Sequence, residues 1–294
     1  MFLTPNPVKK KGMKTVIVKV LSKLRIVNYF NVEIRSKERI TVPVMGGLGY
    51  GNVFGTEKWM SSVLKKLLKR SEGCFVDVGV NIGQTLIKVK SIDRDIDYLG
   101  FEPNPVCVFY AEKLIDLNKF PNTKIIPAGV SNNNEIVTLK YFSTDTTDSS
   151  ASIVDNFRPY EKVVQERSIV VLNSDTIKID KKIAILKIDV EGYELMVVEG
   201  LKKFIVRDRP YIMIEVLPVY SAEYQDRLDR QRAILKIVND LNYAVLKVMK
   251  NPDDTLKEVV RIPDIGIHGD ITHCDYLFIP DEAVAEVLAI VNNA

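Results

Sequence analysis

The sequence predicts an α/β protein built on a mostly parallel sheet with helices on both faces. From residue 73 onward, short apolar runs alternate with segments of helical period, as in chains whose parallel strands are joined by crossover helices. A turn containing Gly79 and Gly83 follows the first buried run, and acidic residues follow three other runs. Because ligands of such sheets bind beyond the carboxyl ends of the strands, these residues mark a candidate site.

Seven apolar runs of strand length are expected to form the main sheet. They are Cys74–Val78, Tyr98–Phe101, Lys124–Pro127, Ile183–Ile188, Tyr211–Val216, Ala244–Val248 and Tyr276–Ile279. Helices are expected after Gly83, at Pro105–Leu117, Gly192–Phe204 and Ala222–Leu241, and from Asp281 to the end. Two further strands are predicted in the polar stretch between the third and fourth runs, at Ile136–Phe142 and Ser168–Leu172.

Residues 1–68 are expected to form a small α+β extension ahead of a main domain that comprises residues 69–294. Apolar residues recur at helical spacing over 16–27, and two alternating runs at 31–35 and 39–44 predict a hairpin. Lys58–Arg70 carries an apolar stripe that is typical of a helix packed on a core. Residues 1–12 are interpreted as a disordered leader or as a remnant before an internal start at Met13.

Composition limits the class of protein. The 294 residues carry 41 basic and 38 acidic side chains, a net charge of +3, so no concentrated basic face for nucleic acid is expected. The amino-terminal segment is basic up to Glu33; a solvated helix face explains this, and peripheral membrane contact is the alternative. The three cysteines lack metal or redox spacing, and no signal peptide or membrane span is found, so a cytoplasmic protein is expected.

The turn after the first strand favours S-adenosylmethionine over NAD as the cofactor. Gly79 and Gly83 allow a backbone to approach a nucleotide-like ligand closely. Asp77 stands where a dinucleotide fold has its first glycine, and its charge would repel a pyrophosphate but attract an ammonium and a sulfonium. Glu102 ends the second strand nineteen residues after Gly83, where such folds place an acid on the ribose hydroxyls.

Carboxylates at the ends of two neighbouring strands are the candidate catalytic groups. Asp189 ends the fourth strand and Glu215 ends the fifth. They either hold a magnesium ion together with water and substrate oxygens, or act as a general base and its hydrogen-bonding partner. Glu194 is explained by the helix dipole.

The two histidines, His268 and His273, lie in the loop before the last strand. Histidine accepts a proton near neutral pH, so His268 is a second candidate base, although a surface role explains either residue. Residues 143–150 are polar and predict either a lid over a hydroxylated substrate or an ordinary solvated loop.

Taken together, these motifs resemble those of the FkbM family of S-adenosylmethionine-dependent methyltransferases. The resemblance runs from about Gly73 to Pro280 and rests on an ordered set of motifs. They are Val76-Asp77-Val78-Gly79-Val80-Asn81-Ile82-Gly83, Phe101-Glu102-Pro103-Asn104-Pro105, Leu186-Lys187-Ile188-Asp189-Val190-Glu191-Gly192 with Glu194, and Ile214-Glu215. It implies the seven-stranded, Rossmann-like methyltransferase fold with an antiparallel last strand, and O-methylation of a hydroxyl on a sugar, glycan or natural product.

The resemblance also implies roles for single residues. The methionine end of the cofactor is assigned to Asp77, Gly79, Asn81 and Gly83. The ribose is assigned to Glu102 with Asn104 beside it, and the adenine is assigned to Val130 and Ser131. Asp189 is placed near the transferred methyl group. Tyr193 departs from the small residue that often follows Glu-Gly in this family, and it is expected to reshape the acceptor pocket.

Two other functions stay open from the sequence. An NAD-linked oxidoreductase uses a similar sheet, but Asp77 opposes a pyrophosphate, and no Tyr-x-x-x-Lys pattern follows the fourth strand. A non-catalytic binding module that keeps the fold is the other alternative. Residues 1–68 lie outside the resemblance and are expected to supply acceptor contacts or the surface of a homodimer.

Overall fold

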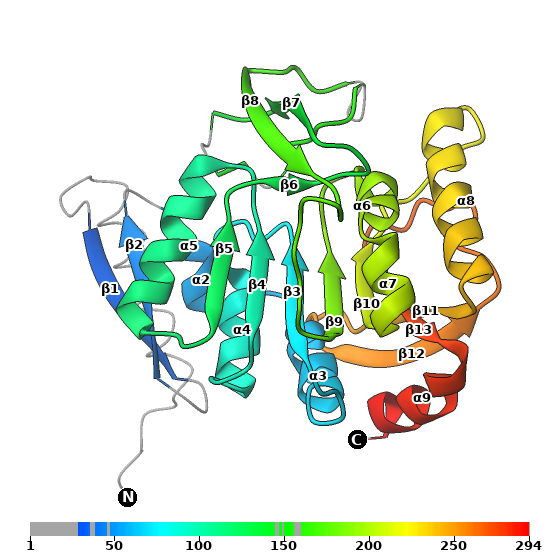
Figure 1. Cartoon of the computed structure of the whole chain (residues 1–294), viewed down its shortest axis with the longest axis horizontal. Helices are drawn as coiled ribbons and strands as arrows, with labels where there is room; N and C mark the ends of the chain where they lie inside the picture. Colours follow the sequence, from blue (N-terminus) through cyan, green and yellow to red (C-terminus); the bar gives the residue numbers. More distant parts are fainter. Residues whose placement is uncertain are drawn as a thin grey trace, which may run out of the picture.

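The computed structural model describes residues 29–35, 39–45, 48–144, 147–148, 150–155 and 160–293. Its centre is an eight-stranded sheet in the order β12-β11-β13-β10-β9-β3-β4-β5 (Figure 1). The strands are β3 (Cys74–Val78), β4 (Tyr98–Phe101), β5 (Thr123–Ile126), β9 (Ile183–Ile188), β10 (Tyr211–Glu215), β11 (Tyr243–Lys250), β12 (Leu256–Ile262) and β13 (Asp275–Pro280).

The fold class predicted from the sequence is confirmed. All seven predicted strands are present, and β13 runs antiparallel to both of its neighbours, β10 and β11. The eighth strand, β12, pairs antiparallel with β11 at the edge of the sheet and was not predicted. Its sequence, Leu-Lys-Glu-Val-Val-Arg-Ile, mixes charged and apolar residues, because only part of this edge strand packs on the core.

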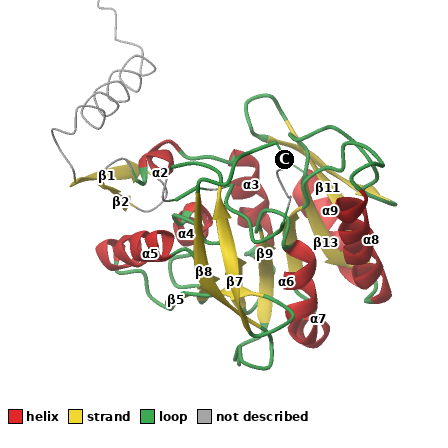
Figure 2. Ribbon diagram, turned by 90° about the horizontal axis from the view of Figure 1, so that it is seen from above, coloured by secondary structure: helices red, strands yellow, loops and turns green. Residues whose placement is uncertain are grey.

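Helices cover both faces of the sheet (Figure 2). One face packs against α3 (Lys58–Leu67), α4 (Gln84–Ile92), α5 (Pro105–Asn118) and α9 (Val284–Asn292), which η1 (Asp281–Ala283) precedes. The other face packs against α6 (Glu194–Gly200), α7 (Lys202–Asp208) and α8 (Gln225–Asp240). Successive strand residues alternate between these two cores, so that Phe75 faces the first and Val76 the second.

The predicted amino-terminal hairpin is present as β1 (Tyr29–Arg35) and β2 (Arg39–Met45), followed by α2 (Tyr50–Phe54). The predicted helix over 16–27 and the basic residues of the leader lie outside the described residues. Residue 68 was the predicted end of the extension, yet α3 shares a hydrophobic cluster with the main sheet. The end of α3 is therefore packed as part of the layer that covers β3 and β13.

A small second sheet lies above the carboxyl ends of the central strands (Figure 1). It consists of β6 (Gly129–Val130), β8 (Gln165–Leu172) and β7 (Glu135–Tyr141) in the order β6-β8-β7. The loop after β7 contains the predicted lid, of which residues 143, 144, 147, 148 and 150 are described. Asp148 accepts hydrogen bonds from the backbone N–H groups of Phe142, Ser143 and Ser150, so this part of the loop folds around one carboxylate.

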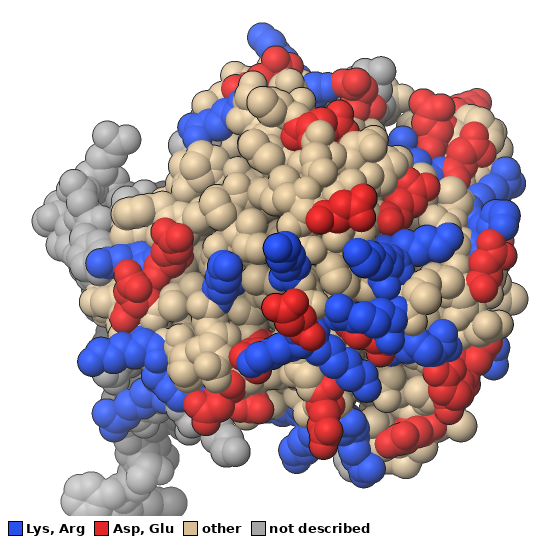
Figure 3. Space-filling model, in the orientation of Figure 1, with Lys and Arg blue, Asp and Glu red and all other residues tan. Residues whose placement is uncertain are grey.

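Basic and acidic side chains are interspersed over the face of the molecule that Figure 3 shows, as the balanced composition predicts. Among the described helices, none combines the length and apolar character that a membrane span requires.

Candidate active site

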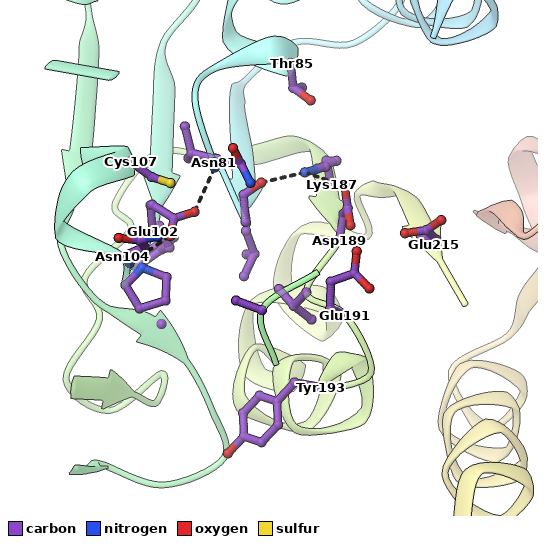
Figure 4. A pocket seen from close by; sticks show the side chains of 18 of the residues that line it. Asn81, Thr85, Glu102, Asn104, Cys107, Lys187, Asp189, Glu191, Tyr193 and Glu215 are labelled. Carbon is purple, nitrogen blue, oxygen red and sulfur yellow. Dashed lines mark hydrogen bonds and ion pairs between the residues drawn. The ribbon is translucent and has the colours of Figure 1, made fainter. Parts of the chain in front are cut away.

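A cavity of about 280 Å³ opens at the carboxyl ends of β3, β4, β9 and β10, beneath the small sheet. One end of this main cavity is bounded by Glu102, Pro103, Asn104 and Val130. The other end is bounded by the carboxylates of Asp189, Glu191 and Glu215 (Figure 4), and Glu57 also lines the cavity. Small-molecule sites span about 300–1,000 Å³, so the volume of this cavity is close to the lower end of that range.

Gly79 brings two strand ends together at the floor of the cavity. It has φ +88°, and a Cβ at this position would lie 1.9 Å from the carbonyl oxygen of Asp189. Asn81 also has a positive φ, of 49°, which asparagine tolerates better than most residues. The turn predicted to approach a ligand therefore also fixes the backbone from which Asp189 projects.

Glu102 is oriented by the turn and by the start of α5. Its Oε2 accepts a hydrogen bond of 2.7 Å from Asn81 N, and its Oε1 accepts one of 2.8 Å from Asn104 N. Figure 4 shows the first of these bonds beside the cavity. Burial raises the pKa of Glu102 to about 7, although the two backbone donors lower it. Carboxylate oxygens can accept more than one bond, so Glu102 can also receive two vicinal hydroxyls.

Lys187 connects the floor of the cavity to its acidic end. The ammonium lies 3.2 Å from Asp77 Oδ1 and 3.3 Å from Asp189 Oδ2, and it donates to the Gly79 carbonyl at 2.7 Å. Burial lowers the pKa of Lys187, but Asp189 and Asp77 more than offset this, and the net shift is upward. Of the described residues that line the main cavity, Lys187 alone is cationic.

Asp77 lies below the cavity and is not among the residues that line it, so its predicted contact with the cofactor stays a prediction. Its side chain is fully buried and also accepts a hydrogen bond from Tyr98 Oη. Burial raises the pKa of Asp77 and Lys187 opposes the shift. Gly83 likewise does not line the cavity; it begins α4 with φ 80° and a Cβ there would meet Leu114.

The predicted pair Asp189 and Glu215 does come together, and Glu191 joins it. One oxygen of each of the three carboxylates lies within 4.8 Å of the others, the spacing of a divalent-cation site. Burial raises the pKa of Glu215 to about 9, with Asp189 and Asp275 adding to the shift. This upward shift of the pKa favours the protonated form of Glu215, which argues against its use as the base.

The opposite end of the main cavity contains the residues assigned to ribose and adenine. Asn104 caps α5 through a bond from Val106 N of 3.1 Å, and Val130 lines the wall on β6. Ser131 is fully buried behind this wall, where its hydroxyl lies 3.0 Å from Tyr193 Oη. Tyr193 itself lines the cavity, as the expectation that it shapes a pocket requires.

His268 is not among the residues that line the main cavity, and its predicted role as a base stays a prediction. The loop that carries it is held next to α8, where Gln231 donates to the Gly266 carbonyl at 3.0 Å. His268 Nε2 lies 3.2 Å from Tyr276 Oη, and burial lowers its pKa. His273 lies 2.7 Å from Asp270 and does not line the cavity either.

The sequence interpretation missed several lining residues, among them Glu57, Gln84, Thr85, Cys107 and Leu139. They come from α3, α4, α5 and β7, whose positions over the strand ends depend on tertiary packing. Lys187 was quoted only within a motif and given no role. The signal that could have identified Lys187 is its charge in an otherwise apolar strand. A buried ammonium needs an acidic partner, and Asp77 and Asp189 are the acids at the ends of this strand and its neighbour.

A mostly parallel sheet in which the antiparallel strand β13 lies between β10 and β11, with an acidic cavity at its carboxyl edge, is the arrangement that the resemblance to S-adenosylmethionine-dependent methyltransferases predicted. The model of the "Methyltransferase FkbM domain" family matches residues 77–245, more than half of the 294 residues. The chain belongs to the FkbM methyltransferase family.

Individual proteins show weaker likeness. The chain is 26% identical over 153 residues to Methyltransferase sdnD of Sordaria araneosa, which is 43% of this chain and 59% of that protein. It thus spans less than two thirds of that relative. The solved FkbM methyltransferase of Methylobacillus flagellatus KT aligns at 18% identity and a TM-score of 0.43, over 70% of this chain and 43% of that one. Aeropyrum pernix fibrillarin with bound S-adenosyl-L-methionine aligns at 12% identity and a TM-score of 0.39, over 86% of this chain and 94% of that one.

The residues of the cavity fit the cofactor of this family. Glu102 offers a carboxylate to the ribose diol, and Pro103, Val130 and Leu139 offer apolar surface to an adenine. The carboxylate of Asp189 faces the region where an ammonium and a sulfonium would be favoured. A pyrophosphate would instead meet these carboxylates with one lysine as its only counter-charge among the lining residues described.

Proposed function

We propose that this protein transfers a methyl group from S-adenosylmethionine to a hydroxyl of a small-molecule or glycan acceptor. The observation that carries the proposal is the polarity of the main cavity. Glu102, fixed by two backbone donors, lies at one end, and the carboxylates around Asp189 lie at the other. The cofactor supplies an electrophilic methyl group. The chain has to place an acceptor oxygen in line with it and to exclude water.

Asp189 is the group that we assign as general base. Its side chain is partly exposed, and its Oδ2 is held 3.3 Å from Lys187 Nζ, so the carboxylate has a fixed direction toward the cavity. The proton leaves the acceptor hydroxyl for Asp189 as the bond from oxygen to the methyl carbon forms and the bond from sulfur to that carbon breaks. Protonated Glu215 is placed to donate a hydrogen bond to another acceptor oxygen.

Magnesium is an additional candidate at the same carboxylates. Asp189, Glu191 and Glu215 are oxygen ligands of the type that this ion prefers. A bound magnesium would displace the proton of Glu215 and would orient an acceptor oxygen through its open positions. The two alternatives differ in a measurable requirement for metal.

Thermal unfolding with S-adenosylhomocysteine, with NAD or with neither, each with magnesium or with a chelator, tests the cofactor and the metal. A ligand at about 100 times its Kd stabilises by about 2.7 kcal/mol, which shifts Tm by roughly 5 to 10 °C in a domain of this size. We expect a shift with S-adenosylhomocysteine only. A shift with NAD instead would restore the oxidoreductase alternative.

Transfer itself is tested with methyl-labelled S-adenosylmethionine and a panel of monosaccharides, polyols and phenols, each paired with its amino analogue. Label in hydroxyl acceptors but not in the paired amines is the expected result. Cofactor binding without transfer to any acceptor would favour the non-catalytic module. Loss of transfer in the chelator, with recovery on adding magnesium, would assign the metal to the carboxylates.

A further inference from the structure

A second cavity of about 100 Å³ adjoins the acidic end of the main cavity. This side cavity shares Glu57, Lys187, Asp189 and Glu215 with the main cavity and extends from them toward α3. Its remaining polar wall comes from Trp59, Lys250 and Asp275. A space of this size holds several water molecules, or one small group of a ligand.

Strand register explains why polar groups collect in the side cavity. Lys187 pairs with Met213, and Glu215 pairs with Asp275, across adjacent strands. Because Lys187, Met213 and Glu215 occupy alternate positions, their side chains face the same side of the sheet, the side that α3 covers. Trp59 in the first turn of α3 closes the space from above.

The indole N–H of Trp59, which lines the side cavity, is a hydrogen-bond donor without an acceptor among the described residues. The side chain is 2% exposed, yet Nε1 has no hydrogen-bond partner among the described residues. Leaving a buried donor unpaired costs about 1–3 kcal/mol, so an acceptor atom from a ligand is favoured there. The ammonium of Lys250 lies 5.1 Å from the centroid of the indole ring and forms an ion pair with Asp275.

The charges of the side cavity select for an uncharged group. A phosphate or carboxylate entering it would face Glu57, Asp189 and Asp275, while an ammonium would face Lys187 and Lys250. Each of the three acids is already paired with a lysine, Glu57 with Lys88, Asp189 with Lys187 and Asp275 with Lys250, so none of the three is left to attract a cation. A hydroxyl is both donor and acceptor, so it can accept from the indole N–H and donate to a carboxylate at the same time. Apolar walls from Met60 and Met213 suit the carbon that carries such a hydroxyl.

We propose that the side cavity is an acceptor subsite that takes an uncharged, hydroxyl-bearing arm adjacent to the hydroxyl that receives the methyl group. The inference rests on the proposed function, because it places the methylated hydroxyl at Asp189 in the main cavity. The preferred acceptors are then polyols and sugars with a second hydroxyl one or two carbons away. Monohydric alcohols and acceptors with a charged group at that position are disfavoured.

Trp59 is the only tryptophan of the 294 residues, so its emission reports directly on the side cavity. The experiment measures this emission for the full chain saturated with S-adenosylhomocysteine, during titration with glycerol and, separately, with 1-propanol. We expect a saturable change with glycerol and at least a tenfold weaker response to 1-propanol, which has the same carbon chain with one hydroxyl. The Trp59→Phe protein supplies the background from tyrosine.

Asp275→Asn tests the wall of the subsite with little change in shape, and Asp229→Asn is the matched control on the exposed face of α8. We expect the half-saturating glycerol concentration to rise at least fivefold in Asp275→Asn and to stay unchanged in Asp229→Asn. If Asp275→Asn does not fold, the comparison of glycerol with 1-propanol decides alone.

Two readouts separate this inference from the proposed function. S-adenosylhomocysteine that stabilises the protein, with no saturable response of Trp59 or with equal responses to both alcohols, would overturn the subsite and leave the proposed function standing. A glycerol-selective response without stabilisation by S-adenosylhomocysteine would support a polyol subsite and overturn the proposed cofactor.

Discussion

Lys187 Nζ lies 3.2 Å from Asp77 Oδ1, and the two side chains, on directly paired residues of β9 and β3, are 5% and 0% exposed. The same ammonium lies 3.3 Å from Asp189 Oδ2 and donates to the carbonyl of Gly79. One cation thus stabilises two acids and the turn between the strand that carries Asp77 and the helix that follows. The contact joins the buried core to the acidic end of the main cavity.

Lys187→Met is expected to lower the free energy of unfolding by about 3–5 kcal/mol, because it leaves the buried charge of Asp77 without its partner. Urea denaturation followed by circular dichroism measures the change. Lys203→Met, on the exposed surface of α7, is the matched control and should change stability by less than about 0.5 kcal/mol. A loss below about 1 kcal/mol for Lys187→Met would show that the ion pair is not a structural requirement.

The raised pKa of Glu102 predicts how the affinity for the cofactor depends on pH. Burial raises the pKa of Glu102 to about 7. The ionised form accepts ribose hydroxyls, so affinity is full above this pKa and is lost as the pH falls through it. If only the ionised form binds, the Kd of S-adenosylhomocysteine rises about tenfold between pH 8 and pH 6. Isothermal titration calorimetry across this range measures it.

Glu102→Gln is the control for that titration. The amide cannot ionise, and one of its two groups faces a backbone N–H of Asn81 or Asn104 that needs an acceptor. Affinity at pH 8 is expected to fall by about 10-fold or more, since a hydrogen bond to a charged group contributes about 1.5–3 kcal/mol. The pH dependence should flatten. If it persisted, a group other than Glu102 would set it.

Asp189→Asn is expected to lower turnover by about 10²–10⁴-fold, the usual contribution of a general base. The amide is isosteric, and S-adenosylhomocysteine lacks the sulfonium charge that Asp189 would favour, so the Kd of S-adenosylhomocysteine is expected to change far less than turnover. Initial rates with a hydroxyl acceptor from the panel and binding of S-adenosylhomocysteine measure the two effects. Asp240→Asn, whose side chain is 60% exposed on α8, is the control. Unchanged turnover in Asp189→Asn would remove this residue from the mechanism.

Much of the fold could be predicted from the sequence, because the strands are short and apolar and the turns carry glycine or proline. Alternation of buried strands such as Ile183–Ile188 with amphipathic helices was sufficient to predict the parallel sheet. The edge strand β12 was missed, since its charged residues remove the apolar run that marks a strand. The division of α6 from α7 at Leu201 was also missed, because the chain continues its apolar pattern through it.

The residues of the candidate site could be predicted only where they stand at the ends of strands. Glu102, Asp189 and Glu215 follow strands directly, so their convergence was predictable from the parallel order. Asp77 was predicted to contact the cofactor, but its side chain faces Lys187 on the neighbouring strand. Which residues of two strands lie opposite each other depends on the register of the folded sheet, so this contact could not be predicted. The position of His268 outside the main cavity could not be predicted, because the path of a long loop next to α8 depends on contacts such as that of Gln231 with Gly266.

Gly79→Ala is expected to be among the most damaging small substitutions at the site. A Cβ at Gly79 would lie 1.9 Å from the carbonyl oxygen of Asp189, and the φ of +88° is one that alanine rarely adopts. Relief of that contact requires the ends of β3 and β9 to separate, which displaces Asp189 and the carbonyl that Lys187 binds. We expect a loss of at least about 2 kcal/mol in unfolding free energy, and loss of S-adenosylhomocysteine binding. Gly51→Ala, in α2 where nothing lies within 4 Å of the new Cβ, is the matched control, and it should be neutral or stabilising by up to about 1 kcal/mol. Equal stability and equal binding of the two alanine variants would contradict the role given to Gly79 as the fixed contact between the two strand ends.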